Sequence, residues 1–170
     1  YDFEGYKIYR ATDFEFNDAY NITDGDGNPT FLEPYVQNGV RAQWDLVDGK
    51  SGWHPVDLNG IKFYLGDDTG LTHSYVDHNV VNGQRYYYAV VSYDYGGDLS
   101  NNIIPRDSPM KLRVNPLTGA VSLGPNVVEV VPSPPSAGFV DAFFAGDQVD
   151  HVLGASSGEV FLEIVDPQMV

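Results

Sequence analysis

Apolar and polar residues alternate with a period of two along Asn82–Tyr95, NGQRYYYAVVSYDY. A turn pair, Asn-Gly, opens this stretch, and the aromatic and β-branched residues that follow are typical of a β-strand. Both sides of the alternation are apolar, so we expect this strand to lie in the middle of a sheet. We also expect Tyr86, Tyr88 and Val90 to be buried together with Ile8 of a facing strand.

The same alternation predicts further short strands, separated by turns rich in glycine, proline, asparagine and aspartate. No stretch keeps the helical period of about 3.6 residues. Many short strands with turns between them predict an all-β fold, an antiparallel β-sandwich. The expected strands are residues 1–12, Ile61–Leu65, Leu71–Asp77, a hairpin of Lys111–Val114 with Ala120–Leu123, Val127–Val131 and Glu159–Val165, with VRAQWDLV (40–47) and GWHPVDL (52–58) as candidates for brief strands.

Charge is strongly unbalanced, with 9 Lys and Arg against 24 Asp and Glu and a formal net charge of −15. Such a surface repels phosphate backbones and anionic membranes, so nucleic acid is not an expected partner, whereas divalent cations are favoured. No apolar run approaches the roughly 18 residues of a membrane span, so we expect no direct membrane insertion. The absence of cysteine excludes disulfides and Cys-ligated metals.

The domain organisation follows from a break near the C-terminal end of the strand pattern. The proline-rich run PSPP at residues 132–135 is typical of a linker or domain boundary. We therefore expect one domain over residues 1–131. Residues 132–170 would hold the linker and the start of a following β module, or a strand that completes the sandwich. Since a strand begins at once and no initiator Met precedes it, we expect a fragment of a longer protein.

Three stretches together resemble the fibronectin type III family. They are EGYKIYRATD (4–13), SYVDHNVVNGQRYYYAVVSYD (74–94) and the turn YGGDLSNN (95–102). The resemblance implies an immunoglobulin-like antiparallel β-sandwich. It also implies that Tyr86 is the family's structural tyrosine corner, whose hydroxyl bonds back to the backbone, and that Tyr88 and Val90 occupy core positions of a later strand.

The same resemblance implies two departures from the family. No counterpart of the family's first two strands is present, and residues at about 14–70 form a long insertion. The first strand would then have an open edge. We expect that edge to be covered by Glu159–Val165, by the insertion or by a second copy of the chain.

The loop DGDGN offers a candidate metal site at Asp24, Asp26 and Asn28. Oxygen ligands at alternating positions of a flexible loop can wrap a hard cation, so Ca²⁺ is the expected cofactor, with Asp18 or Glu33 completing its shell. The other interpretation is an acidic, solvated turn, because Asp, Asn and Gly are turn formers.

Two tryptophans in the insertion, Trp44 and Trp53, are candidate ligand-binding residues. Aromatic side chains on a β-scaffold can stack on sugar rings. The other interpretation is that they fill a small hydrophobic core of the insertion itself.

No motif in the chain points to catalysis. The four histidines lack the HxH and HExxH spacings of zinc sites, and no nucleophile or phosphate-binding motif is present. We therefore expect a non-catalytic structural or adhesive module of an extracellular or cell-surface multidomain bacterial protein, whose partners are other domains of the same chain. The alternative is a carbohydrate- or protein-binding module, accessory to a secreted hydrolase.

Overall fold

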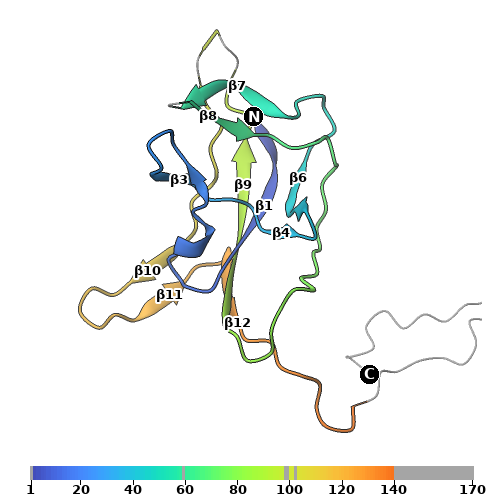
Figure 1. Cartoon of the computed structure of the whole chain (residues 1–170), viewed down its shortest axis with the longest axis vertical. Coiled ribbons are helices and arrows are strands. Elements are labelled where there is room, and N and C mark those ends of the chain that lie inside the picture. The colour runs from blue at the N-terminus through green and yellow to red at the C-terminus, as the bar shows by residue number, and fades with distance from the viewer. Residues whose placement is uncertain (1, 59, 98–99, 102, 140–170) are drawn as a thin grey trace, which may run out of the picture. The chain divides into compact units, whose positions relative to one another are not determined.

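Figure 1 shows the computed structural model of the chain, which describes residues 2–58, 60–97, 100–101 and 103–139. The chain divides into two compact units, Tyr1–Ser133 and Pro134–Val170, and every strand named below belongs to the first. The secondary structure is antiparallel β with one short 3-10 turn, η1 (Asn17–Ala19), and the described residues contain no α-helix. The all-β prediction is confirmed.

Four strands form the central sheet, in the order β12-β9-β1-β6, and all neighbours are antiparallel. The long strands β1 and β9 run side by side through its middle (Figure 1). The prediction that the aromatic strand lies inside a sheet is therefore confirmed. The strand bounds are β1 (Phe3–Ala11), β6 (Gln43–Asp45), β9 (Tyr86–Asp94) and β12 (Val127–Val130).

The edge of β1 that does not contact β9 is covered by the insertion, which supplies β6. Gly5 of β1 allows this close approach, because a Cβ atom there would lie 2.1 Å from the backbone oxygen of Trp44. Of the three covers expected for this edge, the structure therefore shows the insertion.

The remaining strands form four two-stranded hairpins. They are β2 (Ile22–Thr23) with β3 (Pro29–Phe31), β4 (Val36–Gln37) with β5 (Val40–Arg41), β7 (Trp53–Leu58) with β8 (Ile61–Tyr64), and β10 (Leu112–Val114) with β11 (Val121–Leu123). The strands expected near residues 61–65, 111–123 and 127–131 are thus confirmed.

The strand expected at Leu71–Asp77 is wrong. This segment is not part of any ladder among the described residues; instead the Gln37 side-chain amide donates to the Val76 carbonyl at 3.1 Å. Alternation of side chains does not make a strand unless a neighbouring strand accepts its backbone hydrogen bonds. The strand expected at Glu159–Val165 lies outside the described residues.

One face of the central sheet carries the hydrophobic core. Tyr9 and Ala11 of β1 lie opposite Ala89 and Tyr87 of β9, and all four side chains are buried. Val91 and Val127 belong to the same face, and Phe16 and Ala19 of the loop around η1 pack onto it. The core therefore lies between the sheet and the first part of the insertion.

The prediction for Val90 is wrong, because its side chain is 48% exposed. Tyr86 is buried as expected, but Tyr88 and Ile8 are only half-buried. A period-two pattern separates the two faces of a strand, and when both faces are apolar it does not say which one meets the core. The core uses the alternate residues, including Val91, which is 1% exposed.

Candidate functional site

The predicted metal loop is the turn of the β2–β3 hairpin. Asp24 Oδ1 accepts hydrogen bonds from the backbone N–H of Asn28 at 2.8 Å and of Asp26 at 3.0 Å. The Asn28 side-chain amide also donates to this carboxylate, at 3.1 Å. The hydrogen bonds from Asn28 lower the pKa of Asp24. The Asp24 carboxylate is thus turned inward and closes its own loop.

The structure does not bring the proposed completing ligands into this loop. Asp18 accepts hydrogen bonds from the backbone N–H and the hydroxyl of Thr12, at 2.9 and 2.8 Å, and Glu33 lines other cavities. Across the described residues, no group of three or more Asp, Glu or His side chains is arranged to hold a metal ion. Calcium binding at Asp24 and Asp26 stays a prediction.

The two tryptophans lie in different surroundings. Trp44 on β6 is half-buried and meets Tyr75 edge-on, with ring centroids 5.5 Å apart. Trp53 on β7 is 60% exposed and meets the cross-strand Tyr64 edge-on at 5.0 Å. The structure does not bring Trp44 and Trp53 together, since they line different cavities.

Trp53 stands at a cavity of about 520 Å³, which we call the aromatic pocket. Parts of the β2–β3 and β7–β8 hairpins form its walls together with residues 32–34, Arg41 and Gln43 (β3, β7 and β8 are labelled in Figure 1). Its volume lies in the range of about 300–1,000 Å³ that is usual for small-molecule sites. The lining residues that carry charges or aromatic rings are Lys7, Phe31, Glu33, Arg41, Trp53, Lys62, Phe63, Tyr64 and Asp107.

An ion pair between the buried Lys7 and the half-buried Asp107 lines the aromatic pocket. Lys7 Nζ lies 3.1 Å from Asp107 Oδ1 and 3.6 Å from the centre of the Phe63 ring. The Tyr9 hydroxyl donates to the other oxygen of Asp107. Burial lowers the pKa of Lys7 to about 8, although Asp107 acts in the opposite sense. This pair was not predicted from the sequence. The one indication in the sequence is that Lys7 lies on the same face of its strand as Tyr9 and Ala11.

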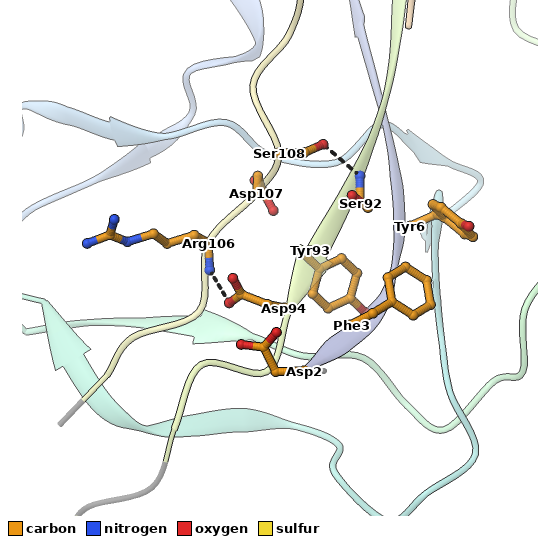
Figure 2. Close-up of a pocket in the computed structure, with 9 residues that line it drawn as sticks. All are labelled: Asp2, Phe3, Tyr6, Ser92, Tyr93, Asp94, Arg106, Asp107 and Ser108. Carbon is orange, nitrogen blue, oxygen red and sulfur yellow. Dashed lines mark hydrogen bonds between the residues drawn. The ribbon is translucent and has the colours of Figure 1, made fainter. Parts of the chain in front are cut away.

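A second hollow, of about 490 Å³, lies beside the start of β1 (Figure 2). The segment 106–108 borders this hollow and is hydrogen-bonded to β9. The backbone N–H of Arg106 donates to Asp94 Oδ1 at 2.8 Å, and the backbone N–H of Ser92 donates to the Ser108 hydroxyl at 3.0 Å. Figure 2 shows the Arg106 guanidinium extending away from Asp94 and Asp2. The two hydrogen bonds drawn in Figure 2 therefore attach the loop of residues 106–108 to the central sheet.

The second face of the sheet carries a polar cluster around Asp77. Its carboxylate accepts hydrogen bonds from Arg10 and Tyr88 at 2.8 Å and from Tyr35 at 3.1 Å. Burial would raise the pKa of Asp77, but the bonds from Tyr88 and Arg10 outweigh it and lower that pKa. These bonds attach the extended segment after β8 to β1 and β9.

Tyr86 makes the kind of bond that the family resemblance implies. Its hydroxyl accepts a hydrogen bond from the backbone N–H of Val81 at 3.0 Å. The Arg10 guanidinium also lies over the Tyr86 ring, 5.1 Å from its centre. The assignment of Tyr86 as the tyrosine corner of a fibronectin type III domain stays a prediction.

Glu4 on β1 is a buried charge without a hydrogen-bond partner. Its side chain is 0% exposed, and neither carboxylate oxygen is hydrogen-bonded. Lys50 Nζ lies 3.9 Å from Oε2, and the charges of Asp48, Asp45 and Asp68 are close enough to act on it. Burial, followed by Asp48, raises the pKa of Glu4 to about 7.

His54 on β7 is buried and hydrogen-bonded to backbone. Its Nε2 lies 2.5 Å from the Gly97 carbonyl, and its Nδ1 lies 3.2 Å from the backbone of Val56. It therefore attaches β7 to the start of the loop that follows β9.

Comparison with known proteins gave no match: no family model, no curated protein and no solved structure is similar to this chain. No helix among the described residues is long and apolar enough to cross a membrane. The function must therefore be argued from the residues themselves.

Proposed function

We propose that this chain is a non-catalytic structural module of a secreted or cell-surface multidomain protein, built on one sheet of a fibronectin type III-like sandwich. The observation that carries the proposal is the difference between the two faces of the central sheet. One face is covered by the core, whereas the other leaves a row of valines in solvent.

The open face spans two neighbouring strands. Val90 of β9 is 48% exposed, and Val128 and Val130 of β12 are 52% and 39% exposed. Val128 lies opposite Tyr88 in the ladder, so all these side chains point to the same side. Isolated apolar residues are normal on a surface, but a contiguous sheet face usually packs against a second layer.

A second β layer is the cover that a sandwich supplies, since two sheets pack face to face about 10 Å apart. The segment after β8 covers part of this face, through the Asp77 cluster near Arg10 and Tyr88 and through Tyr75 against Trp44. The resemblance to the fibronectin type III family supports a sheet as the partner, supplied by another part of the same longer protein.

The contacts of the buried Lys7 and His54 side chains support a structural role. Asp107 is bound by Lys7 and Tyr9, and His54 is bound by backbone. Such contacts hold loops and strands in place and leave these groups without a free proton acceptor directed at a substrate.

The test compares the same substitutions in two contexts. Val90→Asp and Val128→Asp place a charge on the open face, and Val121→Asp on the β10–β11 hairpin is the control. In the chain of 170 residues the two face variants should change the free energy of unfolding by no more than about 0.5 kcal/mol, as exposed sites do. In a longer form of the secreted protein they should cost about 2 kcal/mol or more, because the charge would be buried against the second layer.

Urea denaturation of both forms gives the comparison. Variants tolerated equally well in both contexts would contradict a covering β layer. A loss seen with Val121→Asp as well would mean that the effect is not specific to the open face.

A further inference from the structure

We propose that the aromatic pocket binds a ring-bearing carboxylate, with the ring on Trp53 and the carboxylate between Arg41 and Lys62. A uronic acid unit of an acidic polysaccharide has this chemistry, and so does a small aromatic acid. This inference goes beyond the structural role and does not depend on it.

The charge of the pocket differs in sign from that of the whole chain. Lys7, Arg41 and Lys62 line it, against the two carboxylates of Glu33 and Asp107. The chain has only 9 Lys and Arg and a formal net charge of −15, so most of its surface repels anions. An excess of cations at one cavity is therefore a local preference for an anionic ligand.

The cations at the pocket have different roles. Lys7 is buried and is already paired with Asp107 at 3.1 Å, so this pair is internally neutralised. Arg41 and Lys62 are exposed, and no ion pair joins either to a carboxylate among the residues that the structure describes. These two cations remain available for a ligand, and the Arg41 guanidinium can bind a carboxylate through two parallel hydrogen bonds.

Trp53 provides the surface for a ring. Its indole is 60% exposed, yet it is held edge-on against Tyr64 with centroids 5.0 Å apart. The exposed part of the indole offers an aromatic surface on which a ligand ring can stack. Phe63 is another ring of the pocket, but Lys7 Nζ lies over one of its faces, 3.6 Å from the ring centre.

Arg41 connects the two halves of the proposed site. Its guanidinium lies 5.2 Å from the centre of the Tyr64 ring, the ring that also contacts Trp53. Tyr64 thus contacts both the Arg41 guanidinium and the exposed indole of Trp53. The ligand that matches them carries its charge directly on or next to a ring.

Binding can be measured with the chain itself by tryptophan fluorescence and by calorimetry. The probes are a galacturonic acid oligomer, the neutral galactose oligomer of the same length, and benzoate. We expect the galacturonic acid oligomer or benzoate to bind about tenfold or more tightly than the neutral sugar, since one charge-assisted contact is worth about that factor. Binding should weaken as salt is added, because the cations are exposed.

Four variants locate the site. Trp53→Phe should abolish the fluorescence response, whereas Trp44→Phe, which alters the other tryptophan, should keep it. Arg41→Gln should lower the affinity for the acidic probe about tenfold and leave the neutral sugar unaffected. Lys111→Gln is the matched control for charge, because Lys111 is exposed and lies outside the pocket.

The arms of the experiment separate the sources of the ligand. Preference for the galacturonic acid oligomer points to an acidic polysaccharide, and preference for benzoate points to a small aromatic acid. Equal affinity for charged and neutral sugars, no binding of any probe, or an unchanged response in Trp53→Phe would overturn the proposal. Circular dichroism of each variant shows that the fold is retained.

Discussion

At the scale of single residues, the most informative groups are charges placed inside the sheet. Glu4 and Lys7 both lie on β1 and are both buried, but only Lys7 has a hydrogen-bonded counter-charge. A buried carboxylate without hydrogen bonds favours its protonated form. Its protonation should therefore be linked to folding.

Glu4 makes the free energy of unfolding depend on pH in a defined window. Its pKa is raised from 4.5 to about 7 in the folded state, so the folded chain holds a proton that the unfolded chain releases. The stability contributed by this proton is complete below about pH 4.5 and is lost as the pH rises through about 7. We expect the loss to be on the order of 3 kcal/mol.

Glu4→Gln stays neutral at every pH, so this variant should not show the fall between pH 4.5 and pH 7. The measurement is urea denaturation at several pH values in that window. Glu15→Gln, at an exposed position, is the control and should keep the fall of the parent chain. If Glu4→Gln follows the parent profile, the buried Glu4 carboxyl is not the group responsible.

At the scale of elements, the β2–β3 turn is stabilised by hydrogen bonds within the turn itself. Asp24 accepts two backbone hydrogen bonds across the turn, whereas the Asp26 carboxylate is exposed. Asp24→Ala should lower the free energy of unfolding through the lost bonds, and by more than Asp26→Ala does. Asp26→Ala should cost less than about 0.5 kcal/mol, as an exposed substitution does.

Calcium binding at this turn has a separate readout. If the loop holds Ca²⁺, the melting temperature rises with Ca²⁺ concentration by mass action, and Asp26→Ala removes the rise. Melts that superimpose with excess Ca²⁺ and with chelator would leave the loop as an acidic turn, held by Asp24 alone.

Strands with a regular alternation were predictable from the sequence. The alternation and the Asn-Gly turn pair predicted β9, and the NPLTG turn between two apolar runs predicted the β10–β11 hairpin. The short strands of the insertion were only partly predictable. β6 forms a strand because its backbone pairs with β1. Leu71–Asp77 forms none, because no described strand pairs with its backbone. Pairing of this kind depends on distant residues, which local pattern does not contain.

The candidate sites were less predictable than the strands. Trp53 was a candidate ligand-binding residue from the sequence and lies at a surface cavity, but its separation from Trp44 followed from the path of the insertion. Lys7 and Asp107 are one hundred residues apart in sequence and meet only in the folded chain. A contact of that range has no signature in a single sequence.

At the scale of the whole first unit, the account depends on a sheet with one covered and one open face. Val90 and Val91 are neighbours in β9 and are chemically identical, but their exposures are 48% and 1%. They form a matched pair, because substitution at either position removes the same two methyl groups from the same strand.

The measurement that tests this account most directly is urea denaturation of Val91→Ala against Val90→Ala. We expect Val91→Ala to lower the free energy of unfolding by about 2 kcal/mol, through lost burial and an unfilled cavity. Val90→Ala should lower it by less than about 0.5 kcal/mol, because its side chain is largely in water. Equal losses, or a larger loss for Val90→Ala, would contradict the assignment of the core to the Val91 face.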